Sequence, residues 1–103
     1  MTKQKKAKAP KPYGAVWDAV LRDDIDDLKK ALDRGEIFNE RYGEEDWTPL
    51  MFTCVAGRKK MSKMLMSKKT LVNAANKLGH TAFMLVVAKG DVEMALMLLK
   101  SRA

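Results

Sequence analysis

Apolar residues in the first third of the chain recur at the spacing of amphipathic helices. Within residues 15–34 they form two successive faces, made of Val16, Trp17, Val20 and Leu21 and then of Ile25, Leu28, Ala31 and Leu32. Because residues three or four positions apart share one side of a helix, this pattern predicts two short helices joined by a tight turn. Acidic residues follow Asp24 and basic residues precede Gly35, as the helix dipole favours, and Gly35 is expected to end the second helix.

The same helix pair recurs twice in the rest of the chain. Thr48 is a predicted N-cap, Pro49 follows it at the first helical position, and Gly57 is expected to end that helix. Thr81 and Gly90 repeat the threonine and glycine signals 33 residues later. Each glycine is followed by a second apolar face, made of Met61, Met64 and Leu65 and then of Val92, Met94, Ala95, Leu98 and Leu99. A helix pair at this period is typical of stacked repeats, whose units bury their apolar faces against their neighbours.

Two segments resemble the ankyrin-repeat family. Val72-Asn73-Ala74 through Asn76, Gly79 and Thr81 resembles the family's turn between repeats, and Gly90-Asp91-Val92-Glu93-Met94-Ala95 with Leu98-Leu99 resembles its second helix. The resemblance covers residues 13–103 as one degenerate repeat, one good repeat and one repeat without its final turn, at about 13–45, 46–78 and 79–103. It implies an all-α, ankyrin-type solenoid of stacked helix–turn–helix repeats with short hairpin loops, preceded by an extended basic tail at residues 1–12.

Some positions depart from the family's pattern. Met51 and Met84 replace its turn-stabilising histidine, Asp46 replaces a glycine, and one residue is inserted before Thr48. Val86 and Val87 also fill positions that are small in the family. These departures indicate a divergent member with a loosened hairpin at residues 39–47.

Length and composition restrict the class of protein. A chain of 103 residues with 47% apolar content fits one folded domain and excludes a large multidomain enzyme. The single cysteine, Cys54, cannot form an internal disulfide, which favours a reducing compartment. No apolar run approaches the roughly 20 residues that cross a bilayer, and residues 1–12 lack the apolar core of a signal peptide. We therefore expect a soluble cytoplasmic protein without a membrane partner, with a nuclear location also compatible.

The formal net charge of +7 is unevenly distributed. Residues 1–12 carry +5, residues 13–57 carry −6, and residues 58–103 carry +8. The charge of the tail comes from Lys3, Lys5, Lys6, Lys8 and Lys11. The tail is either a solvated extension or an electrostatic arm for RNA, DNA phosphates or an acidic protein surface such as that of a cytoskeletal filament.

The chain lacks the convergent polar groups that catalysis needs. Its one histidine, His80, has no second histidine or cysteine in support and is interpreted as a surface contact residue. Cys54 falls on an inner-helix position and is interpreted as a structural residue. The acidic run at residues 23–27 fits dipole compensation better than a cation site. We therefore expect no enzyme activity, no cofactor, no metal and no small-molecule substrate.

The resemblance implies that another protein binds a concave face of turn tips and inner helices. The positions carried over as partner-binding residues are Trp47, Phe52, Lys77, Leu78, His80, Leu85 and Lys89. We expect Trp47, Phe52 and Leu85 to form an apolar strip that docks a peptide or protein segment. In the alternative, the distorted hairpin folds Trp47 back onto Tyr42 or the stack.

Two further features bear on partners. A basic run on the outer surface comprises Arg58, Lys59, Lys60, Lys63, Lys68 and Lys69, and it is either a solvated face or, with the tail, a stripe for RNA or an acidic filament. The last helix has little polar covering, so that a partner or further repeats would cover it. The sequence thus predicts a non-catalytic interaction module. The alternative is a constitutive subunit of a ribonucleoprotein or cytoskeletal assembly, anchored by its basic tail and uncapped last repeat.

Overall fold

The computed structural model describes residues 13–101, and in this range the chain forms seven helices and no named strand. They are α2 (Ala15–Arg22), α3 (Ile25–Asp33), α4 (Pro49–Val55), α5 (Lys59–Met66), α6 (Lys69–Val72), α7 (Ala82–Lys89) and α8 (Val92–Lys100). The predicted all-α fold is confirmed. The predicted basic tail at residues 1–12 lies outside the described residues.

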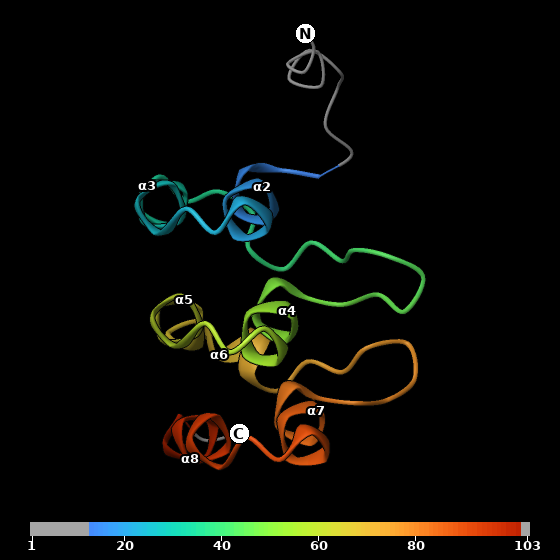
Figure 1. The fold of residues 1–103 in the computed structure, drawn as a ribbon. Helices are drawn as coiled ribbons and strands as arrows, with labels where there is room; N and C mark the ends of the chain where they lie inside the picture. The colour runs from blue at the N-terminus through green and yellow to red at the C-terminus, as the bar shows by residue number, and fades with distance from the viewer. Residues whose placement is uncertain (1–12, 102–103) are drawn as a thin grey trace, which may run out of the picture.

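The helices are arranged as three stacked pairs. Figure 1 shows α2, α4 and α7 in one row and α3, α5 and α8 in a second row beside it, on the left of the view. The loops that lead into α4 and α7 project from the first row, on the side away from the second row. We call α2, α4 and α7 the inner row and α3, α5 and α8 the outer row. None of the described helices combines the length and apolar character needed to span a membrane.

The inner helices α4 and α7 begin at the predicted capping threonines, and α3 begins after a capping aspartate. The side chains of Asp24, Thr48 and Thr81 each accept a hydrogen bond from the backbone N–H three residues later, at 3.0, 3.3 and 3.2 Å. These bonds satisfy amide groups that have no partner within the helix. The predicted starts of α4 and α7 after Thr48 and Thr81 are therefore confirmed, and the caps explain why the chain enters each helix at these positions.

Two aspartates take a backbone conformation that favours glycine. Gly57 and Gly90, which follow the inner helices of the second and third pairs, have φ values of 76° and 86°. Asp23 follows α2 at the corresponding place and has φ 58°. Asp46 likewise has φ 58°, one period before Gly79 at 85°. Aspartate tolerates this left-handed region better than most residues. The backbone therefore keeps the same conformation in each repeat, even where an aspartate replaces the glycine.

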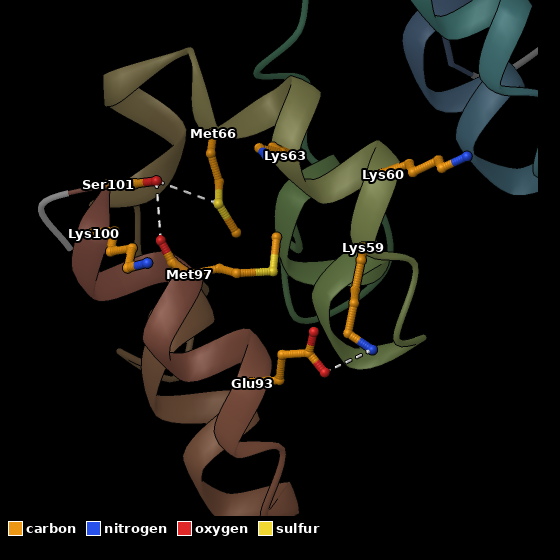
Figure 2. A pocket seen from close by; sticks show the side chains of 8 residues that line it. All are labelled: Lys59, Lys60, Lys63, Met66, Glu93, Met97, Lys100 and Ser101. Atoms are coloured by element: carbon orange, nitrogen blue, oxygen red, sulfur yellow. Dashed lines mark hydrogen bonds and ion pairs between the residues drawn. The ribbon is translucent and has the colours of Figure 1, made fainter.

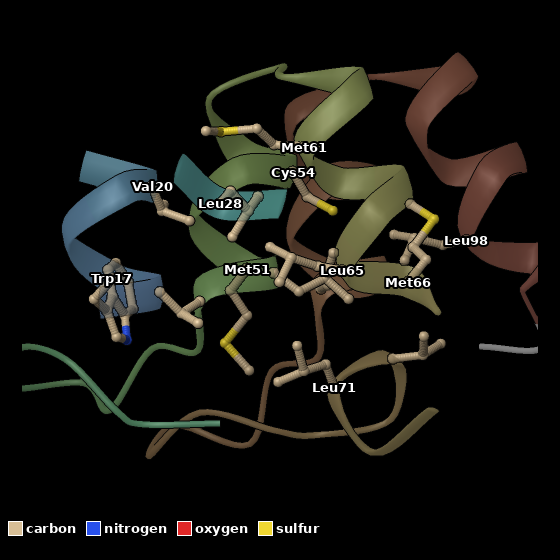
Figure 3. Close-up of a cluster of buried hydrophobic side chains, with 14 of the residues drawn as sticks. Trp17, Val20, Leu28, Met51, Cys54, Met61, Leu65, Met66, Leu71 and Leu98 are labelled. Carbon is tan, nitrogen blue, oxygen red and sulfur yellow. The ribbon is translucent and has the colours of Figure 1, made fainter. Parts of the chain in front are cut away.

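The core runs along the stack between the two rows. Figure 3 shows buried side chains from several pairs in one continuous cluster, with Trp17 on α2 at one end and Leu98 on α8 toward the other. Met51 on α4 and Leu65 on α5 lie between them and are fully buried. Each short pair therefore buries its apolar face against the next, which is how a repeat protein gains stability.

The one-turn helix α6 was not predicted. It lies in the connection between α5 and the second projecting loop, and its Leu71 and Val72 side chains are buried. With four residues, it is too short to show a helical period in the sequence.

Candidate functional site

The two projecting loops are hairpins that are joined to each other. Tyr42 and Trp47 exchange backbone hydrogen bonds of 2.8 and 3.0 Å, which close the first hairpin. In the second hairpin, the Asn76 side chain accepts bonds of 2.9 Å from the backbone N–H groups of Leu78 and His80. The backbone N–H of Lys77 donates to the Glu45 carbonyl at 2.7 Å and connects the two hairpins. These hydrogen bonds fix the backbone of each hairpin and hold the two hairpins together.

Arg41 makes a second connection between the hairpins. Its Nη1 donates to the Asp46 carbonyl at 3.0 Å and to the Ala75 carbonyl at 2.6 Å. A charged donor bound to two carbonyls strengthens both the first hairpin and its link to the second. The loosened geometry expected at residues 39–47 is therefore compensated by side-chain bonds.

An aromatic pocket of about 370 Å³ opens between the first hairpin and the inner row. It is lined by Trp17, Tyr42, Gly43, Glu44, Glu45, Trp47 and Phe52. The ring centroid of Trp17 lies 4.8 Å from that of Tyr42 and 5.8 Å from that of Phe52. Because Trp17 is fully buried, it forms the base of the pocket, while its partners are partly exposed.

Several bonds hold the aromatic side chains in place. The Trp17 Nε1–H donates to the Glu40 carbonyl at 2.6 Å, and the Trp47 Nε1–H donates to Glu45 Oε1 at 2.9 Å. On its other side, the Phe52 ring lies 5.3 Å from the Arg58 guanidinium. A partner would therefore meet aromatic faces whose orientation is already set.

The structure brings two of the three residues of the predicted apolar strip into one pocket. Trp47 and Phe52 both line it, but Leu85, one period after Phe52, is partly buried against the core and does not. The alternative for Trp47 is also partly realised, because its backbone pairs with Tyr42 while its side chain packs partly on the core.

The other predicted contact residues lie on the second hairpin and on α7. Lys77, Leu78 and His80 are exposed, Leu78 by 60%. His80 lies one period after Trp47, at the corresponding place in its hairpin. Lys89 at the end of α7 donates its ammonium to the Val55 carbonyl and connects the second and third pairs. Partner binding by these residues stays a prediction.

Sequence reasoning missed the other five residues of the pocket: Trp17, Tyr42, Gly43, Glu44 and Glu45. Trp17 was placed only on an apolar helix face, and Tyr42 only as a residue onto which Trp47 could fold. The available signal was the concentration of aromatic and acidic residues at 42–47, where the sequence also departs from the family's pattern.

The chemistry of Cys54 fits a structural residue. Its side chain is fully buried, and this burial raises the pKa of the thiol to about 11. The thiol is therefore protonated at neutral pH and is a poor nucleophile. Among the described residues, no group of three histidine, cysteine or carboxylate side chains could hold a metal ion.

Arg22 organises the acidic residues at the start of α3. Its guanidinium forms ion pairs with Asp18, Asp24 and Asp27 at 2.9, 3.2 and 2.7 Å. The hydrogen bonds that the guanidinium donates to the Asp18 and Asp27 carboxylates raise the pKa of Arg22. The hydrogen bond that Asp24 accepts from the backbone N–H of Asp27 lowers the pKa of Asp24, and the hydrogen bond and positive charge of Arg22 lower it further. These contacts account for the acidic cluster as a helix cap with its counter-ion.

The structure divides the basic run at 58–69 into cations with different surroundings. Arg58 donates to the Val20 carbonyl at 2.5 Å in addition to covering Phe52, and the Lys68 ammonium lies 5.1 Å from the Phe38 ring centroid. Lys59, Lys60 and Lys63 instead line a groove between α5 and α8, together with Lys100. We call this the lysine–methionine groove, because Met66 and Met97 also line it.

The outer face of the third pair exposes large apolar side chains. They are Met84, Val87, Val92, Leu96 and Leu99, and between 49% and 69% of each is exposed. Val92, Leu96 and Leu99 belong to α8, and for them the predicted lack of polar covering is confirmed.

A model of the ankyrin-repeat family matches residues 16–103 as three copies. The chain belongs to the ankyrin-repeat family, in agreement with its stacked helix pairs and projecting hairpins. Members of this family are in general protein–protein interaction modules and are typically non-catalytic. None of the curated proteins matches the chain well enough to serve as a relative.

Proposed function

We propose that this chain is a non-catalytic interaction module that binds a segment of another protein on its hairpins and inner row. The aromatic pocket is the observation that carries the proposal. It presents the partly exposed Trp47 and Phe52 in one pocket, whose base is formed by Trp17. Aromatic side chains in pockets commonly supply most of the binding energy of an interface.

The pocket is prepared for binding before any partner arrives. The bond from Trp47 to Glu45 and the backbone links between the hairpins restrict its walls. Binding then orders few side chains, which removes about 0.5–1.5 kcal/mol of entropic cost for each side chain already fixed. This property supports the recognition of a peptide segment by the pocket.

The rim indicates which partner chemistry fits. Glu44 and Glu45 place carboxylates beside the aromatic walls. An apolar anchor flanked by basic residues would complement this arrangement. The exposed side chains of the second hairpin, Lys77, Leu78 and His80, extend the surface along the stack, and Leu85 and Lys89 continue it on α7.

Affinity purification with matched variants tests the proposal. The full chain, Trp47→Ala and Phe52→Ala are used as baits, and recovered proteins are quantified by mass spectrometry. Loss of the same proteins from both variants is expected, whereas Lys30→Ala on the outer row should retain them. Thermal melting by circular dichroism establishes that each bait is folded.

Glu44→Lys provides a variant with little risk to the fold, because Glu44 is exposed at the hairpin tip. Reversing its charge should lower recovery of a partner with basic flanks about tenfold, with its melting temperature unchanged. If Glu44→Lys and a folded Trp47→Ala both recover the partner as well as the unchanged chain does, the pocket is not part of the binding surface.

The exposed apolar side chains on the outer face of the third pair, which we call the end face, favour a second candidate function, as a constitutive subunit of a larger assembly. Met51, Cys54 and Met66 of the middle repeat lie one period before Met84, Val87 and Leu99, and the third helix pair covers them. A helix pair of another subunit would cover the end face in the same way. Light scattering tests this candidate, because a chain that stays monomeric at high concentration does not need that cover.

A further inference from the structure

The lysine–methionine groove lies on the opposite side of the stack from the aromatic pocket. Its volume is about 470 Å³, and Lys59, Lys60, Lys63, Met66, Glu93, Met97, Lys100 and Ser101 line it. In Figure 2 the Met66 and Met97 side chains lie between α5 and α8, with Lys59 and Lys100 on either side of them and Lys60 directed away.

The charges of the groove are strongly unequal. Four lysine residues line it together with a single acidic residue, Glu93, and the ammonium group of Lys60 is directed away from it. Lys59 Nζ pairs with Glu93 Oε1 at 3.2 Å, whereas Lys60, Lys63 and Lys100 form no ion pair with any other residue in the range 13–101. Lysines gathered without counter-ions raise the local concentration of anionic groups.

The floor of the groove is apolar and adaptable. Met66 is 7% exposed and Met97 is partly exposed. The Ser101 hydroxyl lies 3.3 Å from Met66 Sδ and donates to the Met97 carbonyl at 3.1 Å, so it is engaged within the floor. Methionine is unbranched and polarizable, and it adjusts to apolar groups of different shape.

We propose that this groove binds an acidic segment of a partner protein, with an apolar side chain on Met66 and Met97 and flanking carboxylates at Lys63 and Lys100. The apolar floor selects for a segment with an anchor residue, and the lysines select for carboxylates around it. This surface is independent of the one in the proposed function, since it lies on the outer row and has the opposite charge.

The lining favours a protein segment over a nucleic acid. Sites for single-stranded nucleic acids combine a positively charged groove with aromatic rings on which the bases stack, and the groove residues include no aromatic ring. Its cations are lysines, which lack the planar fork by which arginine grips phosphate at two points. The Glu93 carboxylate can accept a hydrogen bond from a peptide N–H, a donor that a phosphate backbone lacks.

Fluorescence anisotropy with a defined peptide tests the proposal. The probe is a labelled peptide in which glutamates flank a central leucine, added to the full chain. We expect saturable binding that weakens about tenfold in Lys63→Glu and in Lys100→Glu, and that falls at high salt. Lys69→Glu makes the same change of net charge at an exposed position outside the groove, and it should bind within about twofold of the unchanged chain.

A second arm tests the apolar floor. Met97→Gln should weaken binding of the leucine peptide but not of a peptide with serine in its place. Thermal melting shows whether this variant is folded, and the two lysine variants keep the proposal testable if it is not. Equal binding of the leucine and serine peptides to the unchanged chain would overturn the role of Met66 and Met97.

Three other results would also overturn the proposal. The first is an absence of saturable peptide binding, and the second is an equal loss of binding in Lys69→Glu and Lys63→Glu. The third is stronger binding of a single-stranded RNA of similar charge, which would assign the groove to nucleic acid. Self-association that Lys63→Glu abolishes would instead make a second copy of this chain the occupant.

Discussion

The middle and last repeats have similar sequences but different surroundings. Thr48 and Thr81 cap their inner helices in the same way, and Gly57 and Gly90 follow those helices with the same backbone conformation. Met51 is nevertheless fully buried, whereas Met84, one period later, is 50% exposed. The third helix pair covers the middle repeat, and no described residue covers the third pair on its outer side.

This difference shows that the repeat period determines the backbone conformation, whereas the position of a repeat in the stack determines whether its side chains are buried or exposed. Met51 Sδ lies 3.5 Å from the backbone N–H of Thr48 and completes a capping interaction inside the core. The same residue type at position 84 presents its side chain on the surface. Pairs of variants at corresponding positions of the two repeats can therefore measure how the surroundings of a side chain affect its contribution to stability.

The largest expected contrast is between Met51→Ala and Met84→Ala. Met51→Ala removes a fully buried side chain and leaves a cavity, so the free energy of unfolding should fall by about 2–5 kcal/mol. Met84→Ala should cost less than about 1 kcal/mol, because half of that side chain is already in water. Urea unfolding followed by circular dichroism measures both. Equal costs would mean that the end face is covered in solution.

Cys54 and Val87 provide a contrast in pH dependence. Burial raises the pKa of the Cys54 thiol from 9.0 to about 11, so the unfolded chain releases this proton first as the pH rises. The folded state then holds more protons than the unfolded state, and the Cys54 contribution to stability falls between pH 9 and 11, by up to about 3 kcal/mol. Unfolding of Cys54→Ala across this range should lack that fall, and Val87→Ala should keep it. If the stability of Cys54→Ala falls by the same amount over this pH range, the loss is due to the titration of other groups.

The threonine caps offer the smallest contrast. Thr48 is fully buried, and its side chain accepts the Met51 N–H, so Thr48→Ala should cost about 1–2 kcal/mol. Thr81 is partly exposed and makes the corresponding bond to Met84 at 3.2 Å, and water can replace part of that bond. Thr81→Ala should therefore cost about 0.5–1 kcal/mol in the same unfolding experiment. A larger loss in Thr81→Ala than in Thr48→Ala would contradict the comparison.

Local signals in the sequence were sufficient to predict the helix pairs. The capping threonines and terminal glycines act over a few residues, so they can be read without knowledge of the fold. The left-handed conformation of Asp23 was not predicted, and Asp46 was identified only as a replacement for a glycine, because this conformation of an aspartate depends on the neighbouring helices as well as on its own type. The helix α6 was not predicted because it is stabilised by burial of Leu71 and Val72 and is too short to show a helical period in the sequence.

The candidate surfaces were predicted less completely, because stacking assembles them from distant residues. Trp17 and Trp47 are 30 residues apart, and only the contact between the first two pairs places both in one pocket. Lys100 likewise joins Lys63 across α5 and α8. The sequence indicated Trp47 and Phe52 as contact residues, but it could not show which aromatic and acidic neighbours they would have.

Amide hydrogen exchange of the complex tests the central claim, that the hairpins and inner row bind the partner, most directly. The full chain is measured alone and with a protein that is recovered in a Trp47-dependent manner. We predict slower exchange at residues 41–56 and 75–85 in the complex, with the largest change in the hairpin that carries Trp47. Unchanged exchange in both hairpins, with protection confined to the outer row, would contradict the claim.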